Sequence, residues 1–322
     1  MKSWAAAYAG RRAVVLGASG FIGRWVARAL VERGAHVIAV GRDADRVRRA
    51  VGARNAPDQV EAYDFERPLA SGWLAALSPD VVFNLAGYGV DRSERDETFA
   101  RRLNRDLVAE LCDAVSSLGA SDWPHARLVH AGSALEYGMT GGVLHEGSPT
   151  AATTVYGETK LAGTTALVER AHASRTRAIV ARLFTVYGAG EHAGRLLPTI
   201  LGAATSGAVV PLSDGMQRRD FAYVEDVAEG LLRLGVSTAE PGAVVNLATG
   251  VMQPVRKFVE AAAAVAGVPR ERLHFGAVAT RPEEMSHTGV SVERLDELTN
   301  WRPSADLQAG IRRTLMRMAK DT

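Results

Sequence analysis

The first half of the chain alternates short apolar runs with longer amphipathic segments. Apolar residues recur every three or four positions in the segments, which predicts helices, whereas the short runs suit strands. Strands are expected at Ala13–Leu16, His36–Val40, Val60–Tyr63, Val81–Leu85, Leu128–Ala131 and Ala178–Leu183, and helices near Phe21–Arg33, Ala44–Val51, Thr98–Leu118 and Val155–Ala173. This alternation predicts an α/β fold in which a doubly wound parallel sheet carries helices on both faces.

The second half of the chain is less regular. Glycines and prolines between Gly188 and Gly215 predict loops and one helix, and Val244–Leu247 suits a further strand of the sheet. The last part is expected to be helical over Val255–Gly267 and Val292–Met318, with a loop between these ranges.

Composition narrows the class of protein. The chain has 322 residues, 47% of them hydrophobic, which suits about two globular domains. Its formal net charge of +2 gives no reason to expect nucleic acid as a partner, and its apolar runs are too short for a membrane span or a signal sequence. The single cysteine, Cys112, cannot form an internal disulfide, which fits a reducing cytoplasm. The eight histidines are scattered, so no metal site is expected.

Three glycines follow the first predicted strand at three-residue intervals. In the stretch Val14–Gly23, Gly17 allows a sharp turn, Gly20 allows the backbone to approach a pyrophosphate, and Gly23 allows close packing of helix on strand. The helix that follows offers free N–H groups and a positive dipole end to phosphates. Strand, glycine turn, helix and second strand together favour dinucleotide binding over an ordinary glycine turn.

The spacing G-x-x-G-x-x-G, together with Tyr156-Gly157-Glu158-Thr159-Lys160, resembles the extended short-chain dehydrogenase/reductase family. The resemblance runs from about Arg12 to about Leu315. That family includes nucleotide-sugar epimerases, dehydratases and ketoreductases. It implies a Rossmann-type cofactor domain at about 1–180 plus 220–250, and a smaller C-terminal lobe for a nucleotide sugar at 181–219 plus 251–322.

The end of the second strand bears on the choice of cofactor. Gly41 stands where related NAD-dependent epimerases carry an aspartate for the ribose hydroxyl, and Arg42 follows it. Arginine suits the 2′-phosphate of NADP, and Arg46 could add charge, so NADP(H) is expected. The alternative is that Arg42 is a solvated loop residue and Asp43 binds the ribose. The resemblance implies that the cofactor contacts Gly17, Ser19, Gly20, Phe21, Ile22, Gly41, Arg42, Arg46, Asp64, Leu85, Ala86, Gly87, Asn104, Tyr156 and Lys160, although for Asn104 a structural role is favoured.

Three residues form the expected catalytic set. Tyr156 and Lys160 lie four apart in a predicted helix and therefore share one face. A nearby ammonium favours phenolate, so Lys160 is expected to lower the pKa of Tyr156 and suit it to proton transfer. Ser133 lies four residues before a Tyr-Gly pair, and the resemblance implies that its hydroxyl shares the substrate oxygen with Tyr156.

Three later segments resemble nucleotide-sugar enzymes of the family. Thr185 replaces an asparagine of the family form, which puts one substrate hydrogen bond in question. Arg219 and Arg281 match arginines that meet the diphosphate, and two guanidinium groups suit such a ligand. The expected substrate contacts are Ser133, Leu135, Thr185, Arg219 and Arg281.

Several reactions remain in competition. A 4,6-dehydratase of this family has an Asp-Glu pair where this chain has Ala134 and Leu135, which argues against elimination. Glu136 is not expected to replace that pair, because in a strand it faces away from Leu135. The resemblance is closest to reductases of 4-keto-6-deoxy sugar nucleotides, with an epimerase as the runner-up. A dinucleotide-binding redox sensor is the non-enzyme alternative, but such proteins typically lose the Tyr/Lys pair.

Two apolar stripes bear on assembly. Leu103, Leu107, Leu111 and Val115 lie along one predicted helix, and Leu161, Thr165 and Val168 lie along another. Family members pair these helices across a twofold axis, so the resemblance implies a homodimer with a four-helix bundle at its interface. The alternative is that both stripes face the sheet of their own chain.

Overall fold

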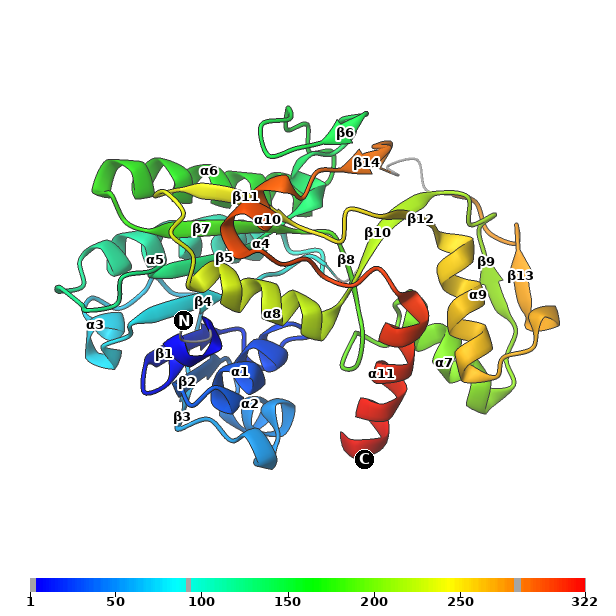
Figure 1. Ribbon diagram of the computed structural model, residues 1–322, viewed down its shortest axis with the longest axis horizontal. Coiled ribbons are helices and arrows are strands. Elements are labelled where there is room, and N and C mark those ends of the chain that lie inside the picture. The colour runs from blue at the N-terminus through cyan, green and yellow to red at the C-terminus, as the bar shows by residue number, and fades with distance from the viewer. Residues whose placement is uncertain (1–3, 91–93, 281–284, 322) are drawn as a thin grey trace.

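The computed structural model describes residues 4–90, 94–280 and 285–321. Its centre is a seven-stranded sheet in the order β11-β7-β5-β4-β1-β2-β3, and every neighbouring pair is parallel (Figure 1). The strands are β1 (Arg12–Leu16), β2 (His36–Gly41), β3 (Gln59–Ala62), β4 (Val81–Asn84), β5 (Leu128–Ser133), β7 (Ala178–Leu183) and β11 (Ala243–Leu247). The α/β, doubly wound fold class is confirmed.

Helices cover both faces of this sheet. Side chains alternate along a strand, so Val14 and Leu16 of β1 join one apolar core, and Ala13 and Val15 join the other. The first core lies under α3 (Trp73–Leu77), α5 (Leu107–Ser116) and α6 (Val155–Ser174), and the second lies under α1 (Gly23–Glu32), α2 (Ala44–Val51) and α8 (Val224–Gly235).

The expected helix over 98–118 contains an irregular turn. It consists of α4 (Glu97–Arg101), a π-helical segment η3 (Arg102–Asp106) and α5. A Cβ on Gly163 of α6 would lie 1.9 Å from the backbone oxygen of Asn104, so this glycine lets α6 approach the π-helical turn closely.

The C-terminal lobe is built from two further groups of elements, and its strands β9 and β13 lie at the right in Figure 1. The strands β12, β10 and β8 form a mixed sheet, and β9 pairs with β13 beside α7 and α9. The elements are β8 (Thr185–Tyr187), α7 (Leu196–Ser206), β9 (Val210–Leu212), β10 (Arg218–Tyr223), β12 (Met252–Pro254), α9 (Val255–Ala266), β13 (Leu273–Phe275) and α11 (Leu307–Asp321).

Some elements differ from the sequence-based expectation. The helix α8 was not expected. The range 292–318, expected to be one helical stretch, forms two helices, α10 (Glu293–Thr299) and α11, with an irregular segment between them. Pro303 in that break cannot donate a helical hydrogen bond. α10 returns to pack on α8 and β11, and the proposed residue boundaries of the two lobes stay a prediction. The remaining short elements are η1 (Trp4–Tyr8), η2 (Ala53–Asn55), η4 (Ala134–Glu136), β6 (Val143–Leu144), η5 (Arg270–Arg272) and β14 (Gly289–Val290).

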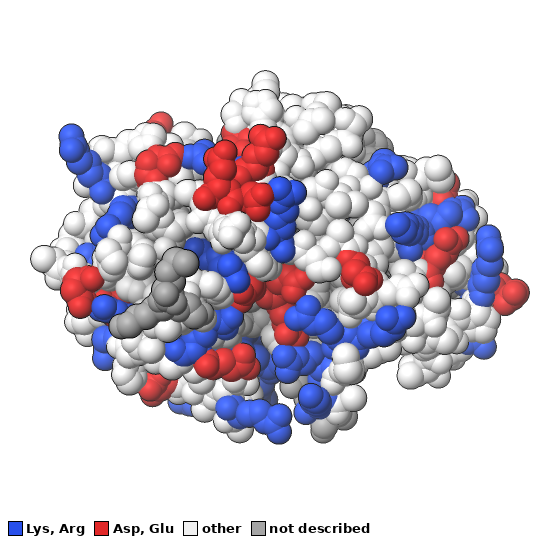
Figure 2. Space-filling model, viewed as in Figure 1, with Lys and Arg blue, Asp and Glu red and all other residues white. Residues whose placement is uncertain are grey.

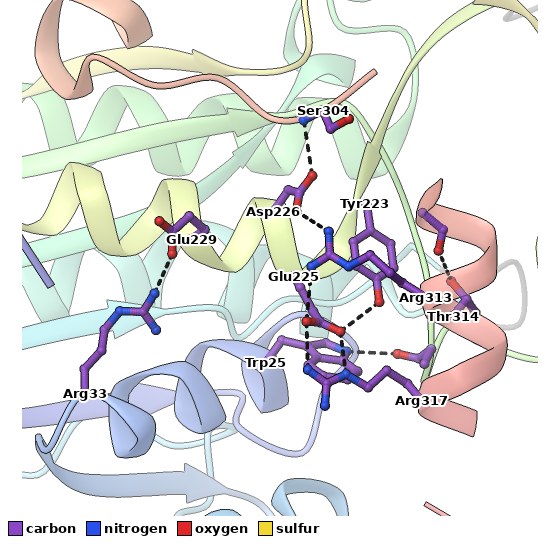
Figure 3. A network of polar contacts seen from close by, with 12 residues as sticks. Trp25, Arg33, Tyr223, Glu225, Asp226, Glu229, Ser304, Arg313, Thr314 and Arg317 are labelled. Carbon is purple, nitrogen blue, oxygen red and sulfur yellow. Dashed lines mark hydrogen bonds and ion pairs between the residues drawn. The ribbon is translucent and has the colours of Figure 1, made fainter. Parts of the chain in front are cut away.

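An ion-pair network joins α11 to α8, and we call it the interlobe network (Figure 3). Arg317 donates to the carboxylate of Glu225 at 2.8 and 3.0 Å, and Arg313 donates to Asp226 at 2.9 Å. The hydroxyl of Tyr223 donates to Glu225 at 2.8 Å. These contacts lie in a cleft of about 770 Å³, and Figure 2 shows basic side chains gathered there between α1 and α11.

The described residues form neither a membrane-crossing helix nor a metal-binding cluster. No described helix combines the length and apolar character that crossing a membrane requires. Within residues 4–90, 94–280 and 285–321, no group of three or more His, Cys, Asp or Glu side chains is arranged to hold a metal ion.

Candidate active site

The glycine loop after β1 lies directly against the end of β4. Gly17 has a φ of +75°, and a Cβ on it would lie 2.7 Å from the backbone of Leu85 and Ala86. A Cβ on Gly23 would lie 2.1 Å from the Gly17 oxygen, so helix α1 begins tightly against the turn. A side chain at these positions would clash with backbone, so glycine alone allows the turn to pack this closely, and we call this turn the glycine cradle. The structure thus brings together the predicted cofactor residues that follow β1 and β4.

The end of β2 lies next to this loop. A Cβ on Gly41 would lie 3.4 Å from the Ser19 hydroxyl. The carboxylate of Asp43 caps α2 by accepting from the backbone N–H groups of Asp45 and Arg46 at 2.9 and 3.1 Å. This bonding occupies one oxygen of Asp43 and gives the residue a structural role of its own.

The two arginines expected at this strand end are exposed. The Arg42 guanidinium lies 5.7 Å from the centre of the Phe99 ring, and Arg46 begins the exposed face of α2. Asp64, which the resemblance assigns to the adenine, is also exposed, forms an ion pair with Arg67 at 3.4 Å, and accepts from the Glu66 N–H. The cofactor contacts of these three residues stay predictions.

Ser133 and Tyr156 meet at the carboxyl end of β5. Ser133 is the last residue of the strand, and its hydroxyl oxygen accepts from the backbone N–H of Leu135 at 3.2 Å. The Ser133 hydroxyl also lies close enough to the Tyr156 phenol to lower the pKa of the tyrosine. A Cβ on Gly89 would lie 3.4 Å from the Tyr156 ring, so the loop after β4 packs against the tyrosine. The predicted proton donor and its serine partner are therefore adjacent.

The ionisation of Tyr156 differs from the sequence-based expectation. Burial raises the pKa of Tyr156 strongly, and the Glu136 carboxylate raises it further, while the hydrogen bond with Ser133 lowers it. The Lys160 ammonium instead donates to the backbone oxygen of Ala131 at 2.5 Å. Burial lowers the pKa of Lys160 to about 8. The expected lowering of the tyrosine pKa by Lys160 is therefore not what these contacts produce.

Glu136 is placed differently from the expectation, although it is still not a free acid. Residues 134–136 form a 3₁₀ turn, so the argument from strand alternation was wrong. The Glu136 carboxylate is fully buried, accepts from the Ser133 N–H at 2.8 Å, and pairs with Arg182 at 2.8 Å. Arg182 also lies 4.4 Å from the centre of the Tyr137 ring. This buried pair fixes the turn that carries Ser133.

Asn104 has the structural contacts favoured from the sequence. Its side chain accepts from the Tyr88 N–H at 3.1 Å and donates to the Tyr88 oxygen at 2.8 Å. It also donates to the Thr159 hydroxyl at 2.9 Å. Asn104 thus connects the loop after β4 to α6 at Thr159, the residue that precedes Lys160.

The predicted substrate residues lie on neighbouring elements. Thr185 of β8 pairs with Phe221 of β10, and Arg219 lies two residues before Phe221. Leu135 is half-buried in the 3₁₀ turn after Ser133. Arg281 lies outside the described residues. Contacts of these residues with a nucleotide sugar stay predictions.

Sequence reasoning missed three residues near this site. Arg195, at the start of α7, is close enough for its charge to favour the phenolate of Tyr156, and it pairs with Glu191 at 3.5 Å. Burial raises the pKa of Glu191 to about 7. His287 is 5% exposed and lies near Arg219; neither ring nitrogen has a hydrogen-bond partner among the residues that the structure describes. No periodicity or spacing marks these residues, because loops bring them to the site.

The first apolar stripe expected at a dimer interface lies inside the chain. Leu103, Leu107, Leu111 and Val115 are at most 4% exposed and belong to the core under the sheet. This stripe was therefore assigned wrongly to an interface. On α6, Leu161 and Val168 are half-buried and Thr165 is exposed, so the second stripe is partly accessible.

Comparison with known proteins bears on the family and the fold of this chain. The model of the NAD dependent epimerase/dehydratase family matches residues 13–248. The chain is 32% identical over 314 residues to a dTDP-6-deoxy-L-talose 4-dehydrogenase (NAD(P)(+)) of Kitasatospora kifunensis, covering 94% of this chain and 93% of that protein. It is 28% identical to a UDP-glucose 4-epimerase of Corynebacterium glutamicum, covering 80% of each chain. The fold is that of the epimerase Mth375 of Methanothermobacter thermautotrophicus, with a TM-score of 0.84, 21% identity, and coverage of 99% and 95% of the two chains.

Proposed function

The chain belongs to the NAD dependent epimerase/dehydratase family, and from that premise we propose that it is an NADPH-dependent ketoreductase of nucleoside-diphosphate 4-keto-6-deoxyhexoses. The observation that carries this proposal is the adjacency of the Ser133 and Tyr156 side chains at the end of β5, beside the glycine cradle. The relative from K. kifunensis acts at C4 of a deoxysugar nucleotide, which supports the same position of attack here.

The proton chemistry follows from these two side chains. The glycine cradle after β1 would hold the dinucleotide, which would supply the hydride for the C4 carbonyl carbon. The raised pKa of Tyr156 keeps its hydroxyl protonated at neutral pH, so Tyr156 is poised to donate a proton to the developing C4 oxygen. Ser133 donates a second hydrogen bond to that oxygen and orients it.

The preference for reduction over elimination rests on neighbouring residues. Ala134 and Leu135 supply no acid or base, and Glu136 is held by Arg182 and the Ser133 N–H. A dehydratase would need such groups to remove water from the sugar. The preference for NADPH rests on Gly41 and on the exposed guanidinium of Arg42, while capping already engages Asp43.

A nucleotide-sugar 4-epimerase is the second candidate. The relative from C. glutamicum supports it, because an epimerase also oxidises and reduces C4. The two functions differ in their use of cofactor: a ketoreductase consumes NADPH, whereas an epimerase regenerates one bound dinucleotide.

The test is a panel of 4-keto-6-deoxy nucleotide sugars with different bases, each incubated with NADPH or NADH. We expect oxidation of NADPH and a C4 alcohol whose configuration NMR identifies. Epimerisation of a 4-hydroxy nucleotide sugar without added cofactor would favour the second candidate, and binding of NADPH without turnover of any sugar would favour a redox sensor.

We also propose that the enzyme is a homodimer, with the half-exposed face of α6 at its interface. Leu161 and Val168 supply apolar contact there, and Thr165 lies between them. Light scattering at micromolar concentration is expected to give the mass of two chains. A mass of one chain would contradict the proposal, and Leu161→Glu should weaken the dimer if α6 is the interface.

A further inference from the structure

A buried histidine lies beside the lysine of the catalytic set. His130 is on β5, three residues before Ser133, and is 0% exposed. Its Nε2 atom lies 3.3 Å from the Nζ atom of Lys160. Its Nδ1 atom lies 3.1 Å from the side-chain amide nitrogen of Asn84, its direct partner in the register of β4 and β5. Both nitrogens of this imidazole therefore face polar groups inside the protein.

The neighbours of His130 determine where its hydrogen lies. Burial and the charge of Lys160 lower the pKa of His130 well below its usual range, so the ring is neutral. A lysine ammonium can only donate hydrogen bonds, so Nε2 has to accept from Lys160. The ring hydrogen is then on Nδ1, and the Asn84 amide beside it has to present its oxygen rather than its nitrogen, giving up the 3.2 Å bond from the Ala86 N–H.

We propose that His130 is a positioning residue that holds the Lys160 ammonium against the carboxyl end of β5. The ammonium has three donors; one goes to Ala131 oxygen and one to His130 Nε2. These two bonds reach Lys160 from one strand, which limits the rotation of the ammonium. This inference rests on the proposed function only in so far as Lys160 assists Tyr156.

The hydrogen bond from Lys160 also bears on the charge of the lysine. Burial disfavours the ammonium, and the Glu136 carboxylate favours it. Glu136 is itself paired with Arg182 of β7, and Tyr156 is the other titratable group on the same face of α6. The π-helical turn packed against α6 presents neutral Asn104, bonded to Thr159. His130 therefore supplies a neutral acceptor that favours the charged lysine where few others exist.

Two substitutions separate positioning from mere packing. His130→Leu keeps an apolar volume but removes the acceptor, and we expect the titration midpoint of Lys160 to fall by about one to two pH units. His130→Gln offers an amide oxygen in its place and should restore most of the midpoint. His130→Phe provides a second acceptor-free variant if the leucine protein does not fold. His172→Leu, at an exposed histidine of α6, is the matched control and should change nothing.

The measurement is ¹³C NMR of protein labelled at lysine Cε, titrated with pH. The chain has four lysines, Lys2, Lys160, Lys257 and Lys320, so four resonances are expected. Lys160→Met identifies the one of interest, which should titrate lower than the other three in the wild type. Thermal melting of each variant checks that the fold is retained.

The outcomes separate this inference from the proposed function. A folded His130→Leu or His130→Phe protein with the wild-type Lys160 midpoint would overturn it, as would a His130→Gln protein shifted as far as His130→Leu. The titration needs no substrate, so failure of the wild type to reduce any 4-keto sugar would overturn the proposed function and leave this result standing. A lowered midpoint in both acceptor-free variants, restored by glutamine, supports the inference.

Discussion

Two polar clusters of this molecule contain arginine–carboxylate pairs but differ in burial. At the end of β5, Arg182 and Glu136 form an ion pair whose side chains are 5% and 0% exposed. In the interlobe network, Arg317 and Glu225 form a pair of the same length whose side chains are 40% and 18% exposed. Glu136 of the first pair also accepts a hydrogen bond from the Ser133 N–H and so stabilises the turn after β5. The second pair joins α11 to α8 (Figure 3).

This difference in burial decides what each pair can do. Water screens an exposed pair and replaces its contacts when it breaks, so such pairs typically contribute about 0–1 kcal/mol. A buried charge that loses its partner has no such replacement, and the loss typically costs about 3–5 kcal/mol. We therefore expect the buried cluster to control chemistry and stability, and the interlobe network to adjust how the two lobes meet.

The largest expected effect is on the rate of NADPH oxidation, when a side chain of the buried cluster is changed. Tyr156→Phe removes one oxygen and leaves the ring to pack, so folding and NADPH binding should persist. Loss of the general acid should slow single-turnover NADPH oxidation on the order of 10²–10⁴-fold. Ser133→Ala should slow it less, because one hydrogen bond to the substrate oxygen remains. A Tyr156→Phe rate within about threefold of the wild type would fall outside the general-acid range and contradict this role.

The next effect concerns the stability of the same cluster. Arg182→Met leaves the buried Glu136 carboxylate without its guanidinium, so the free energy of unfolding should fall by about 3–5 kcal/mol. Urea denaturation at neutral pH measures it. A loss as small as that of Arg317→Met, the same substitution in the interlobe network, would show that burial does not separate the two pairs.

The third effect concerns Arg42, an exposed arginine that is expected to bind the 2′-phosphate of NADPH. Arg42→Ala should weaken NADPH binding about ten- to a hundredfold, since a bond to a charged group contributes roughly 1.5–3 kcal/mol. NADH binding should hardly change. Arg49→Ala, at an exposed position of α2, provides the control in the same fluorescence titration. Equal losses for both dinucleotides would remove the reason for preferring NADP.

The smallest effect is expected in the interlobe network. Arg317→Met removes two hydrogen bonds to Glu225 but leaves Arg313 and the Tyr223 hydroxyl beside it. The free energy of unfolding should fall by about 1 kcal/mol or less, and the difference from wild type should shrink in high salt. A loss of several kcal/mol, insensitive to salt, would mean that this network behaves like a buried one.

Local pattern was enough to predict the centre of the fold. β-Branched runs followed by glycine or polar residues marked the parallel strands, and the glycine spacing marked the turn after β1. The π-helical turn at Asn104 and the 3₁₀ turn at Glu136 were not predicted, because their partners, Tyr88 and Arg182, are remote in sequence. The helix α8 was also missed, although its apolar face packs beneath the sheet.

The catalytic set likewise has a part that the local sequence predicts and a part that depends on residues remote in sequence. Ser133, Tyr156 and Lys160 could be picked out because their spacing resembles a family pattern, and the structure places Ser133 against Tyr156. The bond from Lys160 to His130 could not be predicted, since it depends on which strand lies under α6. Spacing identifies residues in one element, whereas charge balance depends on all the elements packed around them.

The most direct test of the central claim is to follow the hydride itself. The enzyme is incubated with a nucleoside-diphosphate 4-keto-6-deoxyhexose and NADPH in which both hydrogens at C4 of the nicotinamide are deuterium. The sugar product is examined by NMR and mass spectrometry. We predict one deuterium at C4 of the sugar for each NADPH oxidised. Recovery of the unreduced 4-keto sugar with no loss of NADPH would contradict the account.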